Sequence, residues 1–348
     1  MTNTFSIAQH TIGGGRAFLI AEVAQAHDGS LGLAHAFIDA AARAGADAIK
    51  FQTHIAAAES TLDEPFRVKF SRQDETRFAY WQRMEFTPEQ WQGLTEHARE
   101  KGLVFLSSAF SVEAVSLLTR LGMPAWKIAS GELGSTAILD AMMKTGAPFL
   151  LSTGMSGWSE IDALARAIRG AGRDLAILQC TTRYPTPLEQ VGLNVMGEMR
   201  SRYGVPTGLS DHSGRTEPPI AALARGADVL ELHITLDRGM FGPDVPASLT
   251  VDEFRRVADF RDAIAVMDRH PVDKDALAQE LAPVRAMFRR SLAPVRVLHA
   301  GTVLSAEMLT AKKPGTGIPE HELTRIIGRR LVRDVAPERL LRPEDFEA

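Results

Sequence analysis

Four ionisable side chains lie inside short apolar runs, where an unpaired charge would be costly to bury. His212 and His233 fall near the ends of PTGLSDH and VLELHITL, while Lys50 and Lys127 lie within AIKFQTH and AWKIAS. A single buried histidine is more often a satisfied core residue, but two on neighbouring strands can face one site. Two imidazoles suit a divalent metal ion and leave coordination positions open for substrate and water. The histidine pair therefore predicts a metal site.

The two lysines predict an anion-binding site. Lys50 and Lys127 are accompanied by the hydroxyl groups of Ser130 and Ser152. Two ammonium groups with hydroxyls beside them suit a small substrate that carries both a phosphate and a carboxylate.

Carboxylates of the same chain offer an alternative explanation of the lysines. Pairing with Glu22 or Glu132 would satisfy the two ammonium charges without a ligand. Glu22 ends a run of Ala, Val and Ile, where desolvation raises the pKa of a carboxyl group and makes proton transfer near neutral pH possible. Glu22 is therefore the candidate general acid or base. We expect Glu231, in the same run as His233, to orient a neighbouring residue or to face the opposite side of its strand.

Eight short apolar runs alternate with segments of helical period. The runs are AFLIAEVAQ, AIKFQTH, LVFLSSAF, AWKIAS, PFLLST, LAILQCT, PTGLSDH and VLELHITL. Strict alternation predicts a parallel sheet, and eight repeats in about 250 residues predict a (β/α)8 TIM barrel. The active site of such a barrel lies at the carboxyl ends of its strands, and the polar residues do fall late in each run. An open doubly wound sheet is the alternative, but the sequence holds no GxGxxG or GxxxxGK[ST] motif.

Two regions lie outside this alternation. The long segment 55–86 separates the second and third runs, and loops of that length are commonly functional, so we predict a lid over the barrel mouth. The domain boundaries predicted are a catalytic barrel over residues 1–270, a linker over 271–287 and a small β-rich domain over 288–348. So small a domain is marginal alone and is expected to dock on another surface.

The composition is that of an ordinary soluble protein. Of 348 residues, 45% are hydrophobic and 24% charged, the net charge is −4, and acidic and basic residues are interspersed. This pattern argues against nucleic acid and membranes as partners. The lone Cys180 fits a reducing compartment, and the first residues do not resemble a signal peptide. We therefore expect a cytoplasmic protein whose partners are small molecules and copies of itself.

Seven segments resemble the sialic acid synthase family. They are IAEVAQAHDGSLGLAHAFIDAAARAGADAIKFQTH, WKIASGEL, LSTGMS, QCTTRYPTP, GLSDHSG, ELHITLDRGMFGPD and RRSL…AGTVLSAEMLTAKKPGTGI. The family joins a (β/α)8 barrel to a C-terminal domain similar to type III antifreeze protein, the SAF domain. The resemblance implies condensation of phosphoenolpyruvate with the open-chain aldehyde of N-acetylmannosamine or a related 2-acetamido sugar. The products would be a nonulosonic acid and phosphate, and the cofactor Mn²⁺, with Mg²⁺ or Co²⁺ as alternatives.

The resemblance also implies roles for individual residues. Phosphoenolpyruvate would be held by Lys50, Lys127, Ser130, Ser152, Thr182 and Ser210. The sugar would contact Gln52, Tyr184, Asp244 and Lys313. His212 and His233 would bind the metal, and Glu22 would transfer protons. Because the small domain of one subunit covers the barrel mouth of the other in this family, a domain-swapped homodimer is implied.

Three positions depart from the family pattern. Lys313 replaces a usual arginine, Val245 a usual histidine, and Thr182 an asparagine found in some N-acetylneuraminate synthases. These changes leave open a legionaminic- or pseudaminic-acid synthase that acts on a 2,4-diacetamido-6-deoxyhexose. Two remoter alternatives are a Schiff-base aldolase that uses Lys50 or Lys127 as its amine and a non-enzymatic sugar-binding protein.

Overall fold

A computed structural model describes residues 4–347. The chain divides into two compact units, Met1–Arg269 and His270–Ala348. The segment predicted as a linker, 271–287, contains the short helix α11 (Lys274–Glu280) and most of α12 (Ala282–Phe288), which both belong to the second unit.

Eight parallel strands form the core of the first unit. They are β3 (Phe18–Ala24), β4 (Ala48–Thr53), β5 (Val104–Ala109), β6 (Trp126–Ile128), β7 (Phe149–Ser152), β8 (Leu175–Cys180), β9 (Thr207–Asp211) and β10 (Val229–Thr235). Hydrogen bonds link them in the order β5-β4-β3-β10-β9-β8-β7-β6, and the short β11 (Leu249–Thr250) pairs with β10. The eight strands coincide with the eight apolar runs, and this nearly closed sheet confirms the predicted TIM barrel.

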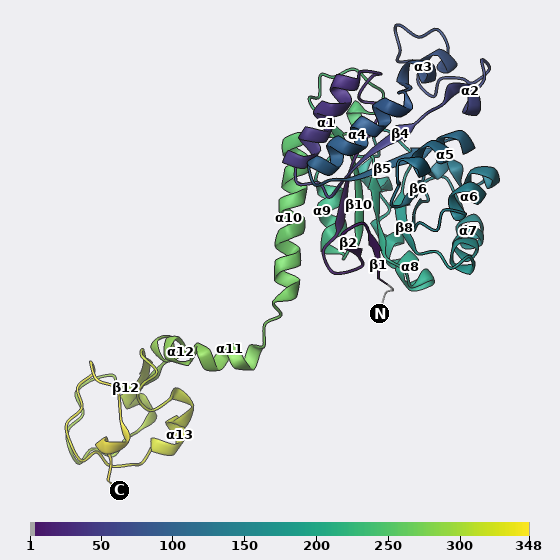
Figure 1. Cartoon of the computed structure of the whole chain (residues 1–348). Helices are drawn as coiled ribbons and strands as arrows, with labels where there is room; N and C mark the ends of the chain where they lie inside the picture. Colours follow the sequence, from purple (N-terminus) through teal and green to yellow (C-terminus); the bar gives the residue numbers. More distant parts are fainter. Residues whose placement is uncertain (1–3, 348) are drawn as a thin grey trace. The chain divides into compact units, whose positions relative to one another are not determined.

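Helices follow the strands and surround the sheet (Figure 1). They are α1 (Leu31–Arg43), α4 (Pro88–Glu100), α5 (Val112–Arg120), α6 (Thr136–Met143), α7 (Trp158–Gly170), α8 (Leu193–Tyr203), α9 (Glu217–Ala224) and α10 (Val251–Arg269). Each amphipathic helix buries one stripe; α7, for example, buries Ile161, Leu164, Ala165 and Ile168 at helical spacing. The start of α4 is fixed by a capping box, in which Thr87 and Gln90 bond each other's backbone N–H groups.

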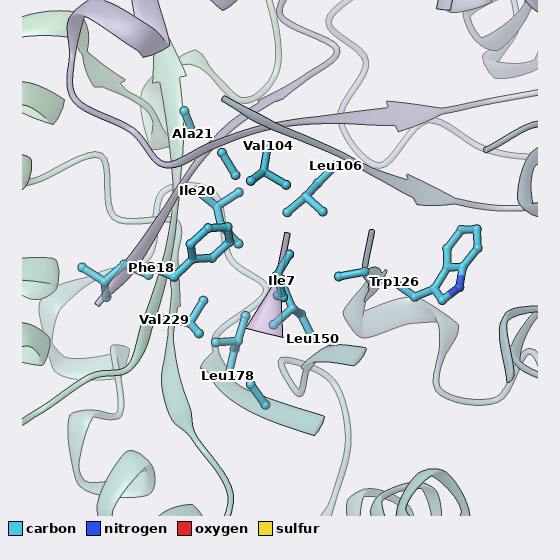
Figure 2. Packing of buried hydrophobic residues seen from close by; sticks show 14 of the residues in the cluster. Ile7, Phe18, Ile20, Ala21, Val104, Leu106, Trp126, Leu150, Leu178 and Val229 are labelled. Atoms are coloured by element: carbon cyan, nitrogen blue, oxygen red, sulfur yellow. The ribbon is translucent and has the colours of Figure 1, made fainter. Parts of the chain in front are cut away.

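The amino-terminal end of the barrel is closed by an antiparallel hairpin of β1 (Phe5–Ile7) and β2 (His10–Ile12). Ile7 and Ile12 are fully buried in the cluster that fills the barrel. Figure 2 shows Ile7 among strand side chains that include Phe18, Leu150 and Leu178. With this end packed by apolar side chains, the polar strand residues are left to the opposite, carboxyl end.

The long segment between β4 and β5 builds a small structure of its own. It contains α2 (Ala56–Glu59) and α3 (Arg77–Met84), and its apolar cluster consists of Tyr80, Trp81 and Met84 packed with Ala56, Phe66, Phe70 and Phe78. Arg83 anchors the segment to the barrel through an ion pair with Asp28 at 2.7 Å, and it pairs with Asp74 of the same segment at 2.8 Å. Its role as a lid stays a prediction.

The second unit has a separate small core. Strands β12 (Ser291–Pro294) and β13 (Leu309–Lys312) pair antiparallel, and α13 (Leu323–Ile326) is a single turn. The buried cluster comprises Leu292, Leu298, Leu304, Ile318, Ile326, Leu331, Val335, Leu341 and Phe346. Across both units, the helices that the structure describes include none with the length and apolar character to span a membrane.

Candidate active site

A cavity of about 280 Å³ opens at the carboxyl ends of the barrel strands. The predicted site residues that line it are Glu22, Lys50, Gln52, Lys127, Ser130, Ser152, Thr182, Tyr184, Ser210, His212, His233 and Asp244. The rule that polar residues fall late in each strand thus places side chains from all parts of the barrel in one cavity.

Lys313 is the predicted site residue that belongs to the second unit. Its ammonium group lies 5.1 Å from the ring centroid of Phe288, a cation–π contact within that unit. The predicted contact between Lys313 and the sugar stays a prediction.

A network of buried charges lies at the centre of the cavity. Lys50 Nζ is 2.8 Å from a carboxylate oxygen of Glu22 and 3.9 Å from one of Glu231, and Lys127 Nζ is 3.2 Å from Glu231. These four side chains are at most 6% exposed. The carboxylate pairing considered from the sequence is therefore present. Lys50 also donates to Ser108 Oγ at 3.2 Å, and Lys127 donates to the Ile128 carbonyl oxygen at 3.5 Å, so a bound anion would share these ammonium groups with partners already in place.

The expectation for Glu132 needs correction, and for Glu231 the structure decides between the two alternatives. Glu132 does not pair with a lysine; it accepts a hydrogen bond from Ser135 at 2.6 Å within the turn after β6. Glu231 takes its place and does not face the opposite side of its strand, because residues two apart on a strand share a face and His233 faces the cavity. Ser210 donates to Glu231 at 3.0 Å, so this carboxylate orients three side chains.

Hydroxyl groups form a cradle beside the lysines. Ser152 Oγ and Thr182 Oγ1 are buried at the cavity wall without a hydrogen-bond partner in the described part of the chain. The Gly154 N–H donates to Ser130 Oγ at 2.9 Å, and a Cβ at Gly154 would lie 2.4 Å from Thr182 Oγ1. Glycine is therefore required for this close approach, and buried hydroxyls without partners are suited to an oxyanion ligand.

Glu22 has the environment of a proton-transfer group. Burial raises the pKa of Glu22 to about 7; Lys50 opposes this rise and Glu231 adds to it. Gln52 donates to its other carboxylate oxygen at 3.0 Å, and Gln25 in turn donates to Gln52 at 2.6 Å. Both the protonated and ionised forms of Glu22 are thus accessible near neutral pH, as an acid–base catalyst requires.

The two histidines face one another with ring centroids 5.1 Å apart. Burial lowers the pKa of His212 to about 4 and that of His233 well below its ordinary value, so both rings are neutral. His212 Nδ1 lies 3.1 Å from the Thr181 carbonyl oxygen, which makes Nδ1 the donor and leaves Nε2 to accept from the Tyr184 hydroxyl at 2.9 Å.

Two neutral imidazoles, of which His212 is held in a fixed tautomer, fit a divalent metal ion. Residues 4–347 include no group of three or more His, Cys, Asp and Glu side chains arranged for a metal. The chain would therefore supply His212 and His233 alone, and substrate and water would complete the coordination shell.

Several residues that line the cavity were not assigned to the site from the sequence, among them Arg67 and, as the partner of a lysine, Glu231. Glu231 could have been assigned from the two-residue period that it shares with His233. Arg67 gave no such signal, because it lies in the irregular part of segment 55–86. Its guanidinium lies 4.2 Å from the centroid of the Tyr184 ring and 3.2 Å from an Asp244 oxygen, and both of these residues are predicted to contact the sugar.

A TIM barrel with paired lysines and carboxylates, free hydroxyls and neutral histidines at its carboxyl end defines an enzyme active site. Comparisons with known proteins are more specific. Residues 37–270 match the NeuB family, and residues 289–347 match the SAF domain. The chain therefore belongs to the NeuB family, and the predicted membership of the sialic acid synthase family is confirmed.

Three relatives illustrate the similarity. N,N'-diacetyllegionaminic acid synthase of Campylobacter jejuni is 32% identical over 335 residues, which cover 94% of this chain and 99% of the relative. Human N-acetylneuraminate-9-phosphate synthase is 31% identical over 323 residues, 90% of this chain and 88% of the relative. The crystal structure of a sialic acid synthetase from Leptospira borgpetersenii, in complex with citrate, has a TM-score of 0.71 and 29% identity, and covers 83% of this chain and 98% of that chain.

The charge network yields a prediction for stability. In Glu231→Gln, Lys127 loses its buried carboxylate partner, so the free energy of unfolding should fall by about 3–5 kcal/mol in urea titrations. Glu96→Gln is the control: Glu96 is exposed, accepts from Gln92 on α4, and should change stability by less than about 0.5 kcal/mol. Equal stability of the two variants would show that the pairing contributes nothing.

Proposed function

We propose that this protein condenses phosphoenolpyruvate with the open-chain aldehyde of a 2-acetamido sugar, giving a nonulosonic acid and phosphate. The observation that carries the proposal is one cavity in which two buried lysines adjoin hydroxyls that lack partners, Ser152 and Thr182. Phosphate and carboxylate on one small molecule are the anions that such an arrangement accommodates.

The proposed reaction assigns the proton steps to Glu22. C3 of phosphoenolpyruvate bonds to the aldehyde carbon, and the aldehyde oxygen takes the proton of the Glu22 carboxyl group. Water then adds to C2 and gives a proton to the Glu22 carboxylate. The bond between C2 and the phosphate oxygen breaks, the C2 hydroxyl becomes the keto group, and its proton leaves with phosphate.

The other residues of the cavity bind and orient. Lys50, Lys127, Ser130, Ser152, Thr182 and Ser210 would hold phosphoenolpyruvate, and Gln52, Tyr184 and Asp244 would contact the sugar. His212 and His233 would hold a divalent ion, which we propose to be Mn²⁺, with Mg²⁺ and Co²⁺ as alternatives. When bound, such an ion supplies Lewis-acid polarisation of a carbonyl oxygen.

The acceptor sugar is proposed as a class. Relatives at similar identity are named as synthases of N,N'-diacetyllegionaminic acid, pseudaminic acid and N-acetylneuraminate 9-phosphate. N-acetylmannosamine and 2,4-diacetamido-6-deoxyhexoses are therefore both candidates.

The rival mechanisms receive less support. A Schiff-base aldolase needs a neutral lysine, but the carboxylates of Glu22 and Glu231 raise the pKa of Lys50 despite its burial. A non-enzymatic sugar-binding protein would not need a pKa-shifted carboxyl beside a buried lysine.

We also propose a domain-swapped homodimer located in the cytoplasm. Side chains around α12 support the dimer, since Val284, Met287 and Phe288 are 46–65% exposed and an apolar surface of this kind favours a covering partner. The lone cysteine, Cys180, is consistent with a reducing compartment.

The reaction can be tested with a panel of acceptors. The purified protein should release phosphate from phosphoenolpyruvate when Mn²⁺ and one 2-acetamido sugar are present, because both substrates must be bound for C–C bond formation. Phosphate is measured colorimetrically and the product by mass, with N-acetylmannosamine and 2,4-diacetamido-6-deoxyhexoses in separate reactions.

Two controls belong to this experiment. His212→Ala, His233→Ala should lose both the activity and the Mn²⁺ dependence. The second control is treatment with borohydride. A substrate-dependent covalent adduct on Lys50 or Lys127 would support the Schiff-base aldolase instead. A folded, Mn²⁺-loaded protein that releases no phosphate with any sugar would contradict the proposal.

The assignment of Glu22 predicts a pH dependence. The protonated carboxyl group is the reactive form, so kcat/KM should fall about tenfold per pH unit above the pKa of about 7. Glu22→Gln cannot titrate and should lose this alkaline limb, with kcat about 100-fold lower. Glu96→Gln should keep the wild-type profile. An unchanged limb in Glu22→Gln would assign the titration to another group.

Subunit mixing tests the swapped dimer. If Lys313 reaches the partner's barrel, Lys313→Ala and Glu22→Ala subunits should each have low activity, and mixing should restore about one wild-type site in each heterodimer. Activity is measured before and after mixing, with subunit exchange verified by mass. No recovery after verified exchange would mean that each barrel is covered by its own small domain.

A further inference from the structure

Each cation that lines the cavity has a carboxylate partner among the described residues. Lys50 pairs with Glu22, Lys127 with Glu231, Arg67 with Asp244 and Arg77 with Glu64. The two lysines lie beside the hydroxyl cradle, where the proposed function places phosphoenolpyruvate. Apart from these lysines, their carboxylate partners and the histidines, the charged side chains that line the cavity are Arg67, Arg77 and Asp244, and we expect the acceptor to be recognised among them.

Arg77 is committed to the segment that carries it. Its Nε is 3.2 Å from a Glu64 oxygen, an NH group donates to the Pro65 carbonyl at 3.0 Å, and the guanidinium lies 5.0 Å from the Trp81 ring centroid. All three partners belong to segment 55–86. Arg77 thus holds this segment together.

Arg67 has donors to spare. One nitrogen bonds to Asp244 Oδ1 at 3.2 Å, and the guanidinium lies 4.2 Å from the Tyr184 ring centroid. A guanidinium has five N–H donors, and the Arg67 side chain is 44% exposed, whereas that of Asp244 is 15% exposed. The pair therefore presents several donors and carboxylate lone pairs to the cavity with no net charge.

We propose that the Arg67–Asp244 pair is the specificity element for the acceptor and selects an uncharged, hydroxyl- and amide-bearing sugar over a sugar phosphate. This inference rests on the proposed function. Hydroxyl groups of a neutral sugar can donate to Asp244, and an amide or hydroxyl oxygen can accept from Arg67. The neighbouring Phe66 and Phe70 give the same wall an apolar surface for the carbon skeleton.

A phosphate in this position would be disfavoured for an electrostatic reason. To pair with a phosphate, Arg67 must leave Asp244, and the carboxylate then faces a dianion in a partly buried site. Each of the other cations that line the cavity in the described chain already has a carboxylate partner, so none is free to compensate the charge of the phosphate. Asp244 thus acts as the discriminating group, and Arg67 supplies the donors.

The test compares two acceptors, N-acetylmannosamine and N-acetylmannosamine 6-phosphate. Each is assayed with phosphoenolpyruvate and Mn²⁺ as a substrate or, where it does not react, as a competitive inhibitor of the accepted sugar. The wild type should favour the uncharged sugar at least tenfold. Asp244→Asn removes the repelling charge with little change of shape and should shift the ratio toward the phosphate at least tenfold.

Arg67→Ala should have a different effect. It removes charge-assisted donors, so kcat/KM for the neutral sugar should fall about 10- to 100-fold while the KM for phosphoenolpyruvate stays within about twofold. Lys69→Ala is the matched control, because Lys69 is an exposed cation of the same segment outside the cavity and should leave both acceptors unchanged.

The outcomes separate this inference from the function on which it rests. A wild type that prefers the 6-phosphate, or an Asp244→Asn variant with an unchanged acceptor ratio, would overturn the inference while the synthase activity remained. If Arg67→Ala lowers kcat/KM equally for both acceptors and raises the KM for phosphoenolpyruvate, Arg67 stabilises segment 55–86 and does not select the acceptor. A wild type that releases no phosphate with any sugar would overturn the proposed function and the inference together.

Discussion

The structure depends on four charges buried at the carboxyl end of the barrel. Lys50 and Lys127 can be placed there because Glu22 and Glu231 lie within ion-pair distance. Strand register aligns Glu22 with Lys50, whereas Lys127 on β6 and Glu231 on β10 belong to strands that are not neighbours in the sheet. Glu22 on β3 lies opposite Lys50 on β4, and Glu231 on β10 lies opposite Ser210 on β9. A shift of one residue in β3, β4 or β10 would turn a charged side chain toward the helices. The strand register that forms the barrel is therefore also required to form the site.

The same network prepares the chemistry of the cavity. Buried ion pairs seldom stabilise a fold more than apolar packing of equal volume would, so their presence calls for a functional reason. A bound anion could share the ammonium groups with the carboxylates, and the elevated pKa of Glu22 lets this carboxyl group exchange a proton near neutral pH. Neutral histidines on β10 and just after β9 complete a cavity in which anion, proton and metal sites adjoin.

Sequence patterns could predict what the barrel geometry determines. The eight apolar runs gave the eight strands, and the position of polar residues late in those runs led to Lys50, Lys127 and both histidines. Glu132 was the wrong partner because β6 ends at Ile128, so that residue lies in a turn with its carboxylate bonded to Ser135. Glu231 shares a strand face with His233, but its pairing with Lys127 could not be recognised from the sequence because β10 and β6 are not neighbouring strands.

The positions of side chains on irregular segments cannot be predicted from strand or helix period. Arg67 lies in a stretch without helical or strand period, and its position depends on how the aromatic cluster of segment 55–86 packs and where Arg83 anchors it. The strand charges are locked by register and can change only together, whereas a loop residue such as Arg67 can be replaced without disturbing a ladder. In this architecture, the charged groups Glu22, Lys50 and Lys127 lie on strands, whereas the Arg67–Asp244 pair that we propose to select the acceptor lies on loops. Asp244, in the loop between β10 and β11, contacts Arg67 and so completes this loop pair.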